Sequence, residues 1–326
     1  MPVPAVSIII PNYNYARFIG ETLQSVLDQT FTDFEAIVVD DGSKDNSVEV
    51  IRSFASRDAR IRVVEKTNGG LSSARNAALP LLKGRLVTFL DSDDIWTPDF
   101  LSTMVEHFEK NPKAMVAFSN ARLFESGTGR LLGGWFGPNS RRTPYSGRIA
   151  AKLFIEGNHI PIVTAMVRRE VIDKAGAFDI RFRVGEDWDF WLRVASHFKV
   201  DYIDRELCRI RRHSSNSSFL PLNAFNQIRI YRKTLRWNHD MVRWVTPKTM
   251  KGAWYRSYYE LGRVLTLQGK GYRARMNFKR ALKYRRNPFA TKLWFYYLLT
   301  FLPSMKPVIL LRGWLVRVRR LMPRPI

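Results

Sequence analysis

The stretch LVTFLDSDD, residues 86–94, decides the fold of this 326-residue chain. Its first five residues are apolar or β-branched and predict a short buried strand. Asp91, Ser92, Asp93 and Asp94 follow this strand directly. Carboxylates gathered at one strand end repel each other unless a cation lies among them, and hard oxygen ligands suit Mg²⁺ or Mn²⁺. The stretch therefore predicts a divalent metal site at the end of a strand.

A helix N-cap is the alternative explanation for these acids. Asp94 or Thr97 precedes a predicted helix that is opened by Pro98, and a cap of this kind needs one such residue. Three acids in four positions are more than a cap requires, so the metal site is favoured.

Apolar and helix-like segments alternate on the N-terminal side of residue 86. We predict strands at 5–11, 34–39 and 61–65, and helices at 16–29, 47–56 and 72–82. This alternation predicts an α/β domain whose mostly parallel, Rossmann-like sheet is covered by helices on both faces. Farther along we predict helices at 97–110, 169–175 and 187–197, strands at 115–120, 199–203 and 207–211, and an irregular loop at 124–146.

Polar residues follow three of the predicted strands. They are Pro11-Asn12-Tyr13-Asn14, Asp40-Asp41 and the acidic group that begins at Asp91. Ligands of parallel sheets bind beyond the carboxyl ends of the strands, so these residues are expected to share one site. Asp41-Gly42-Ser43 alone has the composition of an ordinary turn. Because this triplet lies beside a second acidic strand end, the carboxylates at these two strand ends are expected to bind the base and the ribose of a nucleotide.

The net charge of +24 is concentrated in the last third of the chain. Residues 222–326 contain 24 Lys and Arg against two acids, whereas residues 1–221 carry a net charge of only +2. We therefore predict two domains, 1–221 and a helical, strongly basic region 222–326. Spacings in 258–281 match one tetratricopeptide-like helical hairpin, a unit that needs neighbours to bury its apolar face.

Cys208 is the only cysteine, so no intrachain disulfide forms. The N-terminus lacks the pattern of a secretory leader, and the apolar run 293–302 is about half the length that spans a bilayer. These features predict a cytoplasmic protein.

Five ordered motifs resemble those of the family 2 glycosyltransferases, inverting enzymes of the GT-A fold. The motifs are VSIIIPNYN at 6–14, VVDDGSKDNS at 38–47, NGGLSSARNAAL at 68–79, FLDSDD at 89–94 and GEDWDFW at 185–191. The resemblance implies transfer of a sugar from a nucleotide diphosphate, with a UDP-sugar favoured, to a glycan or lipid-linked acceptor in cell-surface polysaccharide synthesis.

The resemblance also implies roles for individual residues. The donor would be bound by Pro11, Asn12, Tyr13, Asn14, Asp40, Asp41, Arg75, Asp91 and Ser92. Mn²⁺ or Mg²⁺ would be held by Asp93, with Asp91 and His213 as further ligands. Asp187 would be the catalytic base, with Glu186 as the second candidate.

The same residues have ordinary structural alternatives. Acids in a first helical turn are common caps, which applies to Glu186 and Asp187. A lone histidine such as His213 is more often a structural donor. For Trp188 and Trp191, core packing is favoured over a contact with the acceptor sugar.

Two interpretations of the basic region remain open. The aromatic run 293–299 and the arginine-rich run 308–322 suit peripheral attachment to anionic lipids on the inner face of the plasma membrane, and equally a buried aromatic helix with solvated arginines. A polyanion- or nucleic-acid-binding protein is the alternative function for the whole chain. It leaves 91–94 and 185–191 unexplained, so no nucleic-acid partner is expected.

Overall fold

The computed structural model describes residues 3–137, 147, 149–213, 222–237, 245–284 and 291–301. The chain forms two compact units. Unit 1 comprises Met1–Phe219 and Lys233–Val245, and unit 2 comprises Leu220–Arg232 and Thr246–Ile326. The predicted boundary at 221/222 remains a proposal, because helix α8 (Leu222–Trp237) is divided between the two units.

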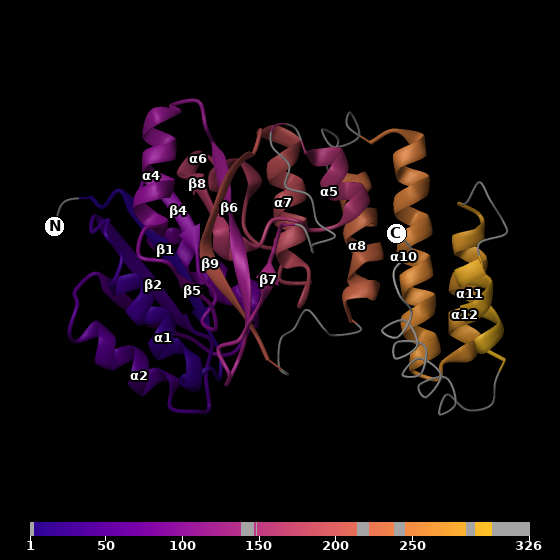
Figure 1. Cartoon of the computed structure of the whole chain (residues 1–326), viewed down its shortest axis with the longest axis horizontal. Helices are drawn as coiled ribbons and strands as arrows, with labels where there is room; N and C mark the ends of the chain where they lie inside the picture. The colour runs from indigo at the N-terminus through magenta and orange to yellow at the C-terminus, as the bar shows by residue number, and fades with distance from the viewer. Residues whose placement is uncertain are drawn as a thin grey trace, which may run out of the picture. The chain divides into compact units, whose positions relative to one another are not determined.

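The first half of unit 1 alternates strands and helices, as predicted (Figure 1). The strands are β1 (Val6–Asn12), β2 (Phe34–Asp40), β3 (Ile61–Glu65) and β4 (Leu86–Phe89), and the helices are α1 (Ala16–Leu27), α2 (Ser47–Ala55) and α3 (Leu71–Ala78). The four strands are parallel, in the order β3-β2-β1-β4. Every residue of β1 and β2 is buried, as expected for central strands covered on both faces. The predicted α/β class is confirmed.

The sheet continues beyond β4 with strands of mixed direction. They are β8 (Ala165–Arg168), β6 (Val116–Glu125), β9 (Asp201–Arg212) and β5 (Ile95–Trp96), with β7 (Leu131–Gly134) paired to β6. The pair β6–β9 is parallel and the others are antiparallel. The accompanying helices are α4 (Phe100–Lys110), α5 (Ala150–Glu156), α6 (Arg169–Ala175) and α7 (Glu186–His197), with short 3₁₀ helices at Leu79–Leu81 and Ile162–Thr164.

Three predictions in this half were wrong in detail. The two strands expected at 199–203 and 207–211 are one strand, β9, because pairing with β6 resumes at Glu206 after a register shift that takes up Asp204 and Arg205. The expected loop 124–146 begins as a hairpin, in which the amide of Glu125 donates to the carbonyl of Arg130 at 2.9 Å. Strand β5 was missed because two residues carry no periodicity.

Unit 2 is helical in its described residues. Besides its part of α8 it contains α10 (Pro247–Leu267), α11 (Gly271–Leu282) and α12 (Thr291–Leu299). The predicted hairpin is formed by α10 and α11, with Thr246 capping α10 through a hydrogen bond of 3.2 Å from the amide of Thr249. The hydrophobic core around the hairpin also draws on α8 and α12, and its buried residues are Ile228, Tyr258, Leu261, Leu265, Ala274, Phe278, Ala281 and Leu293. The predicted helix at 308–322 lies outside the described residues.

None of the helices in the described residues is both long and apolar enough to cross a membrane.

Two glycines of α10 provide a matched test of the hairpin. A Cβ at Gly262 would lie 2.6 Å from the ring of Phe278, whereas a Cβ at Gly252 would meet nothing within 4 Å. Gly262→Ala is expected to lower the free energy of unfolding by about 1–3 kcal/mol through overpacking. Gly252→Ala should raise it by up to about 1 kcal/mol, because alanine is the better helix former.

Denaturant unfolding of both variants measures this difference. Equal effects at the two positions would show that α10 and α11 do not pack closely at Phe278.

Candidate active site

The ends of β1 and β2 form one loop cluster held together by side chains. Asn12 Nδ2 donates to Asp40 Oδ1 at 2.8 Å, and Ser43 donates to the same carboxylate from its hydroxyl at 2.6 Å and its amide at 2.9 Å. Asp40 is buried and Pro11 lies within the buried strand β1. Asp40 thus shapes the loop, and its predicted contact with the nucleotide remains a proposal.

Asn14 and Tyr13 occupy the tip of this cluster. Asn14 has a left-handed backbone with φ of 55°, which its side chain supports by accepting a hydrogen bond of 2.7 Å from the amide of Lys44. Asparagine tolerates this conformation better than most residues. Tyr13 is 45 % exposed, so its ring is available to a planar base.

Asp41 binds the loop that precedes α3. Its carboxylate accepts hydrogen bonds from the amides of Gly69 at 3.0 Å and Gly70 at 2.6 Å, and Lys66 Nζ lies 2.6 Å away. Gly70 has φ of 87°, which glycine adopts readily. Asp41 therefore orders this loop, and a base would have to share its oxygens with these donors. Sequence reasoning missed Lys66.

The acidic group after β4 divides into two kinds of residue. Asp94 is structural: its carboxylate accepts a hydrogen bond of 2.8 Å from the amide of Arg211. Ser92 is buried, and its carbonyl accepts from Thr22 Oγ1 at 3.0 Å. Asp99 occupies the N-cap position of α4, so the cap explanation for Asp94 is wrong.

Asp91 and Asp93 remain as the candidate metal ligands. Burial, followed by the charge of Asp91, raises the pKa of Asp93. The Asp93 carboxylate lies 2.9 Å from His213 Nε2, whose ring packs on Tyr15 and Phe18. His213 thus pairs with a candidate ligand, and its own ligation remains a prediction.

A divalent cation fits the chemistry of these two carboxylates. The pKa of Asp93 is raised because burial disfavours its charged form, and a cation would offset that cost. Among the described residues no group of three or more His, Cys, Asp or Glu side chains is arranged to hold a metal. Asp91 and Asp93 would therefore hold Mn²⁺ or Mg²⁺ together with phosphate oxygens and water.

Arg75 of α3 joins the two acidic regions of the site. Its guanidinium lies 2.7 Å from Asp91 and 2.8 Å from Glu186, and the side chain is 1 % exposed. Burial would lower the pKa of Arg75, but the neighbouring carboxylates of Asp91 and Glu186 raise it overall. The ring of Phe178 lies 5.3 Å from the guanidinium carbon. Arg75 is therefore a permanent cation that connects the end of β4 to the start of α7.

Glu186 and Asp187 form the first turn of α7, after Gly185 in a left-handed conformation. Burial and the charge of Asp187 raise the pKa of Glu186 to about 7, despite Arg75. Burial also raises the pKa of Asp187, with Arg75 opposing. Asp187 is partly exposed and accepts a hydrogen bond of 2.6 Å from Asn158 Nδ2.

This geometry distinguishes the two acids. Glu186 is buried on Arg75, whereas Asp187 is only partly buried. A base must be within hydrogen-bond reach of the proton that it removes. Asp187 therefore suits a catalytic base better than Glu186 does. Asn158, which orients Asp187, was missed because no local pattern marks it.

The tryptophans of α7 belong to the core. Trp188 is 5 % exposed and donates from Nε1 to the carbonyl of Leu153 at 2.9 Å, and Trp191 is fully buried. The core-packing interpretation applies to both.

The raised pKa of Glu186 predicts a pH-dependent stability. Between its ordinary value of 4.5 and its folded value of about 7, the folded protein binds a proton that the unfolded chain has lost. The contribution of Glu186 to stability is thus largest at low pH and is lost as the pH rises through about 7. Glu186→Gln imitates the protonated form. Its melting temperature relative to the unsubstituted protein should therefore increase from pH 5 to pH 8.

The exposed Glu109 provides a control, Glu109→Gln, measured by the same melting experiments. A difference for Glu186→Gln that stays constant with pH would show that Glu186 titrates near its ordinary value.

Comparison with known proteins places this site in a family. The family model described as Glycosyl transferase family 2 matches residues 7–176. An uncharacterized glycosyltransferase of Nostoc sp. is 30% identical over 227 residues, which cover 68% of this chain and 69% of that protein. The chondroitin synthase of Pasteurella multocida is 28% identical over 222 residues, or 68% of this chain and 22% of that enzyme. The chain spans about a third of the length of the first curated relatives, between 31% and 35%.

Solved structures share the fold. TarS 1-349 of S. aureus in complex with UDP-GlcNAc superposes with a TM-score of 0.56 at 19% identity, covering 86% of this chain and 88% of that chain. The mannosyltransferase PcManGT of Pyrobaculum calidifontis, in complex with GDP-Man and Mn²⁺, superposes with a TM-score of 0.59 at 16% identity, covering 92% and 85%. These likenesses bear out the predicted GT-A fold. With its motifs, fold and family match in agreement, this chain belongs to glycosyl transferase family 2.

Proposed function

We propose that this chain transfers a sugar, with inversion, from a nucleotide diphosphate to a glycan or lipid-linked acceptor in a metal-dependent reaction of cell-surface polysaccharide synthesis. The observation that carries the proposal is the bridge made by Arg75 between Asp91 and Glu186. It places the acidic strand end, suited to a metal-bound diphosphate, beside the acids suited to deprotonate an acceptor. A donor and an acceptor can meet between them.

The reaction is a single displacement. Asp187, which is oriented by Asn158, accepts the proton of an acceptor hydroxyl. As that proton leaves, the hydroxyl oxygen of the acceptor forms a bond to the anomeric carbon of the donor sugar. The bond between that carbon and the diphosphate oxygen breaks, and its electron pair leaves with the nucleoside diphosphate. A divalent ion bound at Asp91 and Asp93 would supply positive charge for the leaving diphosphate.

A UDP-sugar is the donor that we favour. The exposed ring of Tyr13 offers a stacking surface for the base, and Asp41 and Asp91 offer oxygens to base and ribose groups. The complexes of the structural neighbours contain UDP-GlcNAc in one case and GDP-Man in the other. A donor screen with Mn²⁺ or Mg²⁺ that detects released nucleoside diphosphate decides between uridine and guanosine donors.

Substitution of the two acidic groups separates binding from chemistry. Asp187→Asn should lower the transfer rate by at least about 10²-fold and leave donor affinity nearly unchanged, because it removes only the base. Asp93→Ala should instead abolish the dependence of donor affinity on Mn²⁺ or Mg²⁺.

Calorimetric titration of the nucleoside diphosphate, with and without metal, and turnover assays measure the two effects. An unchanged transfer rate in Asp187→Asn would mean that Asp187 is not the catalytic base and that Glu186 is the next candidate. Metal-dependent affinity that survives Asp93→Ala would rule out Asp93 as the ligand.

The location that we propose is the cytoplasmic face of a membrane with anionic lipids. Unit 2 exposes apolar side chains at four-residue spacing, Tyr272 and Met276 on α11, and Trp294 and Leu298 on α12, with Phe301 following. Residues 222–326 contribute the excess of 22 positive charges. Apolar and cationic side chains together are what an anionic headgroup layer binds.

A vesicle sedimentation assay tests this location. Leu298→Ser with Phe301→Ser should weaken binding to phosphatidylserine-containing vesicles, since it removes apolar surface without changing charge. Leu131→Ser with Leu132→Ser, two exposed leucines of β7, is the matched control. Equal binding by both double variants, or by a chain without residues 290–326, would contradict membrane attachment.

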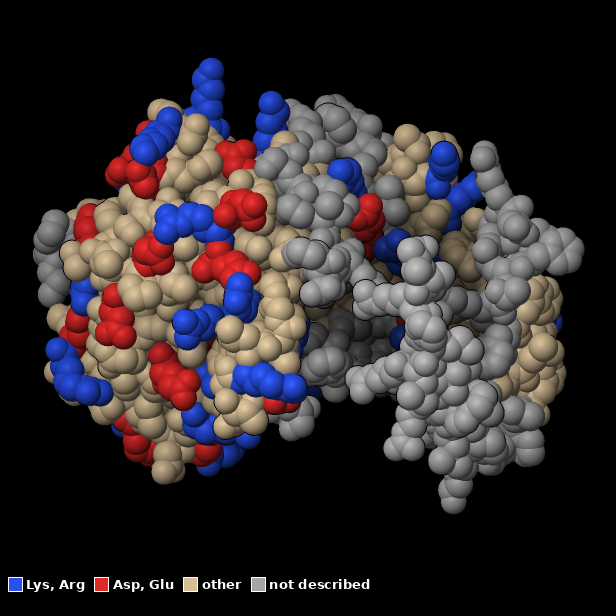
Figure 2. Space-filling model, viewed as in Figure 1, with Lys and Arg blue, Asp and Glu red and all other residues tan. Residues whose placement is uncertain are grey.

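The alternative of a polyanion-binding protein also rests on the charge of residues 222–326. Figure 2 shows acidic and basic side chains intermixed over the described surface of unit 1 on this face, without a basic stripe of the kind that tracks nucleic acid. The sugar-transfer proposal explains residues 91–94 and 185–191 as well, and it is therefore preferred.

A further inference from the structure

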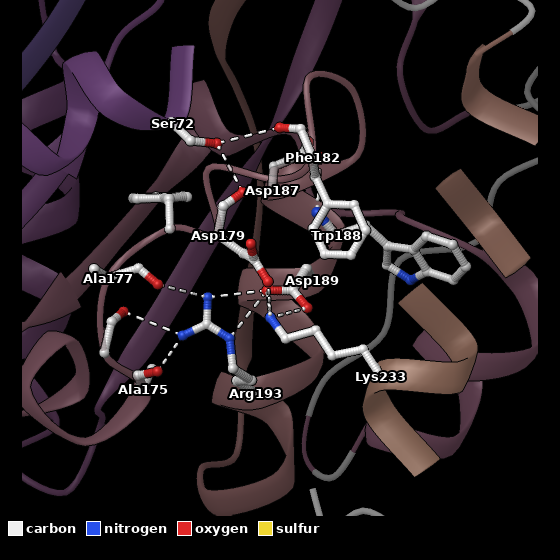
Figure 3. Close-up of polar contacts among 12 residues, drawn as sticks. Ser72, Ala175, Ala177, Asp179, Phe182, Asp187, Trp188, Asp189, Arg193 and Lys233 are labelled. Atoms are coloured by element: carbon white, nitrogen blue, oxygen red, sulfur yellow. Dashed lines mark hydrogen bonds and ion pairs between the residues drawn. The ribbon is translucent and has the colours of Figure 1, made fainter. Parts of the chain in front are cut away.

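Figure 3 shows a group of charged side chains that includes Asp189 and Arg193 of α7. Lys233, in the part of α8 that belongs to unit 1, places Nζ 2.7 Å from the Asp189 carboxylate and 2.9 Å from Asp179. Arg193 pairs with Asp189 at 3.1 Å, and Arg181 pairs with Asp179 at 2.6 Å. Asp189 is almost fully buried, with 2 % of its side chain exposed. None of these residues has a part in the proposed displacement.

These charged side chains form a network that holds the segment 176–185 in place. The segment directly precedes the candidate catalytic acids. Arg193 donates to the carbonyls of Ala175, Gly176 and Ala177, at the start of the segment. Ser72 of α3 donates to the carbonyls of Asp179 and Phe182, at 3.3 Å each. The segment is thus held by its backbone to α3 and α7.

Asn76 of α3 adds two further bonds to this segment. Its Nδ2 donates to the carbonyl of Phe178 at 2.8 Å, and its Oδ1 accepts from the Phe178 amide at 2.8 Å. Since α3 also carries Arg75, the segment and the bridge from Asp91 to Glu186 share one helix.

Lys233 has a position in this network that the two arginines lack. Arg181 lies two residues from Asp179 in sequence, and Arg193 lies one helical turn from Asp189, so each of these pairs is local. Lys233 contacts both carboxylates and so joins the segment to the helix from a third element, while its Nζ lies 5.5 Å from the centre of the Phe182 ring. If a cation shared by two buried carboxylates is removed, their negative charges lose compensation, and the folded arrangement that holds them together is strongly destabilised.

We propose that Lys233 is a positioning residue for the sugar transfer: by clamping Asp179 to Asp189 it fixes the entry into α7, and with it Asp187, at the working distance from the donor. Asp189 follows Asp187 by two residues on the same helix. Small displacements of a base from its working position cost up to about 10²-fold in rate. The inference rests on the proposed function of Asp187.

The test compares Lys233→Met, Lys233→Arg and the control Arg232→Met. Arg232 is the exposed neighbour on α8, so its substitution removes the same charge without touching the network. Lys233→Met should lower kcat by about 10-fold or more and change the donor KM by less than about twofold, because Asp41, Asp91 and Asp93 lie on other elements. Lys233→Arg should restore most of kcat, and Arg232→Met should resemble the unsubstituted protein.

Hydrogen exchange gives a readout that needs no turnover. In Lys233→Met, amides of 176–187 should exchange faster than in the unsubstituted protein, while amides of β1, β2 and β4 should not change. If all three variants keep the kcat of the unsubstituted protein, or if KM rises in step with a general loss of protection, the positioning role is wrong. If the unsubstituted protein transfers no sugar but the amides of 176–187 still exchange faster in Lys233→Met, the proposed function is wrong. The structural role of Lys233 in holding this segment is then still supported.

Discussion

The buried guanidinium of Arg75 is the interaction on which the rest of the site depends. A cation that is 1 % exposed is stable only if carboxylates surround it, and here Asp91 and Glu186 approach it from different elements. The end of β4, the middle of α3 and the start of α7 must therefore keep a fixed relation. Without the arginine, the carboxylates of Asp91 and Glu186 would have no cation between them, and either one would take up a proton or the elements would separate.

This constraint explains why the acids of the site divide into supporting and reacting groups. Asp40, Asp41 and Asp94 receive hydrogen bonds from neighbouring amides and side chains, and these bonds shape the loops around the donor site. The side chain of Asp91 is 30 % exposed, and Asp187 is partly exposed although it also accepts hydrogen bonds from the Trp188 amide and from Asn158. Loops ordered by buried carboxylates and a rigid parallel sheet together provide the preorganised geometry that a displacement reaction needs.

Local sequence signals predicted the first half of the fold well. Strands β1 to β4 were found because each is an apolar, β-branched run ended by polar residues. Asp91 and Asp93 were singled out as acids after such an end, and Asp187 through the resemblance to family 2, and their roles stay predictions. Three residues that act over long sequence separations and lie outside the recognised motifs were not found. Lys66 reaches Asp41 across 25 positions, Asn158 reaches Asp187 across 29, and Lys233 reaches Asp189 across 44. Nothing adjacent to these residues in the sequence records their partners, which only the folded chain brings near.

The acids with raised pKa values gather at the site, and they include the supporting residue Asp94. Among the described residues, the carboxyl groups with raised pKa values are Asp93, Asp94, Glu186 and Asp187, all in the site. Those with lowered pKa values, such as Asp45, Asp58 and Asp179, lie outside it and accept hydrogen bonds from nearby donors. Burial of several ionisable acids in one place costs stability there, and acids with raised pKa values are characteristic of functional sites. The raised pKa values of Asp93, Glu186 and Asp187 therefore agree with the proposed cation and the proposed catalytic base.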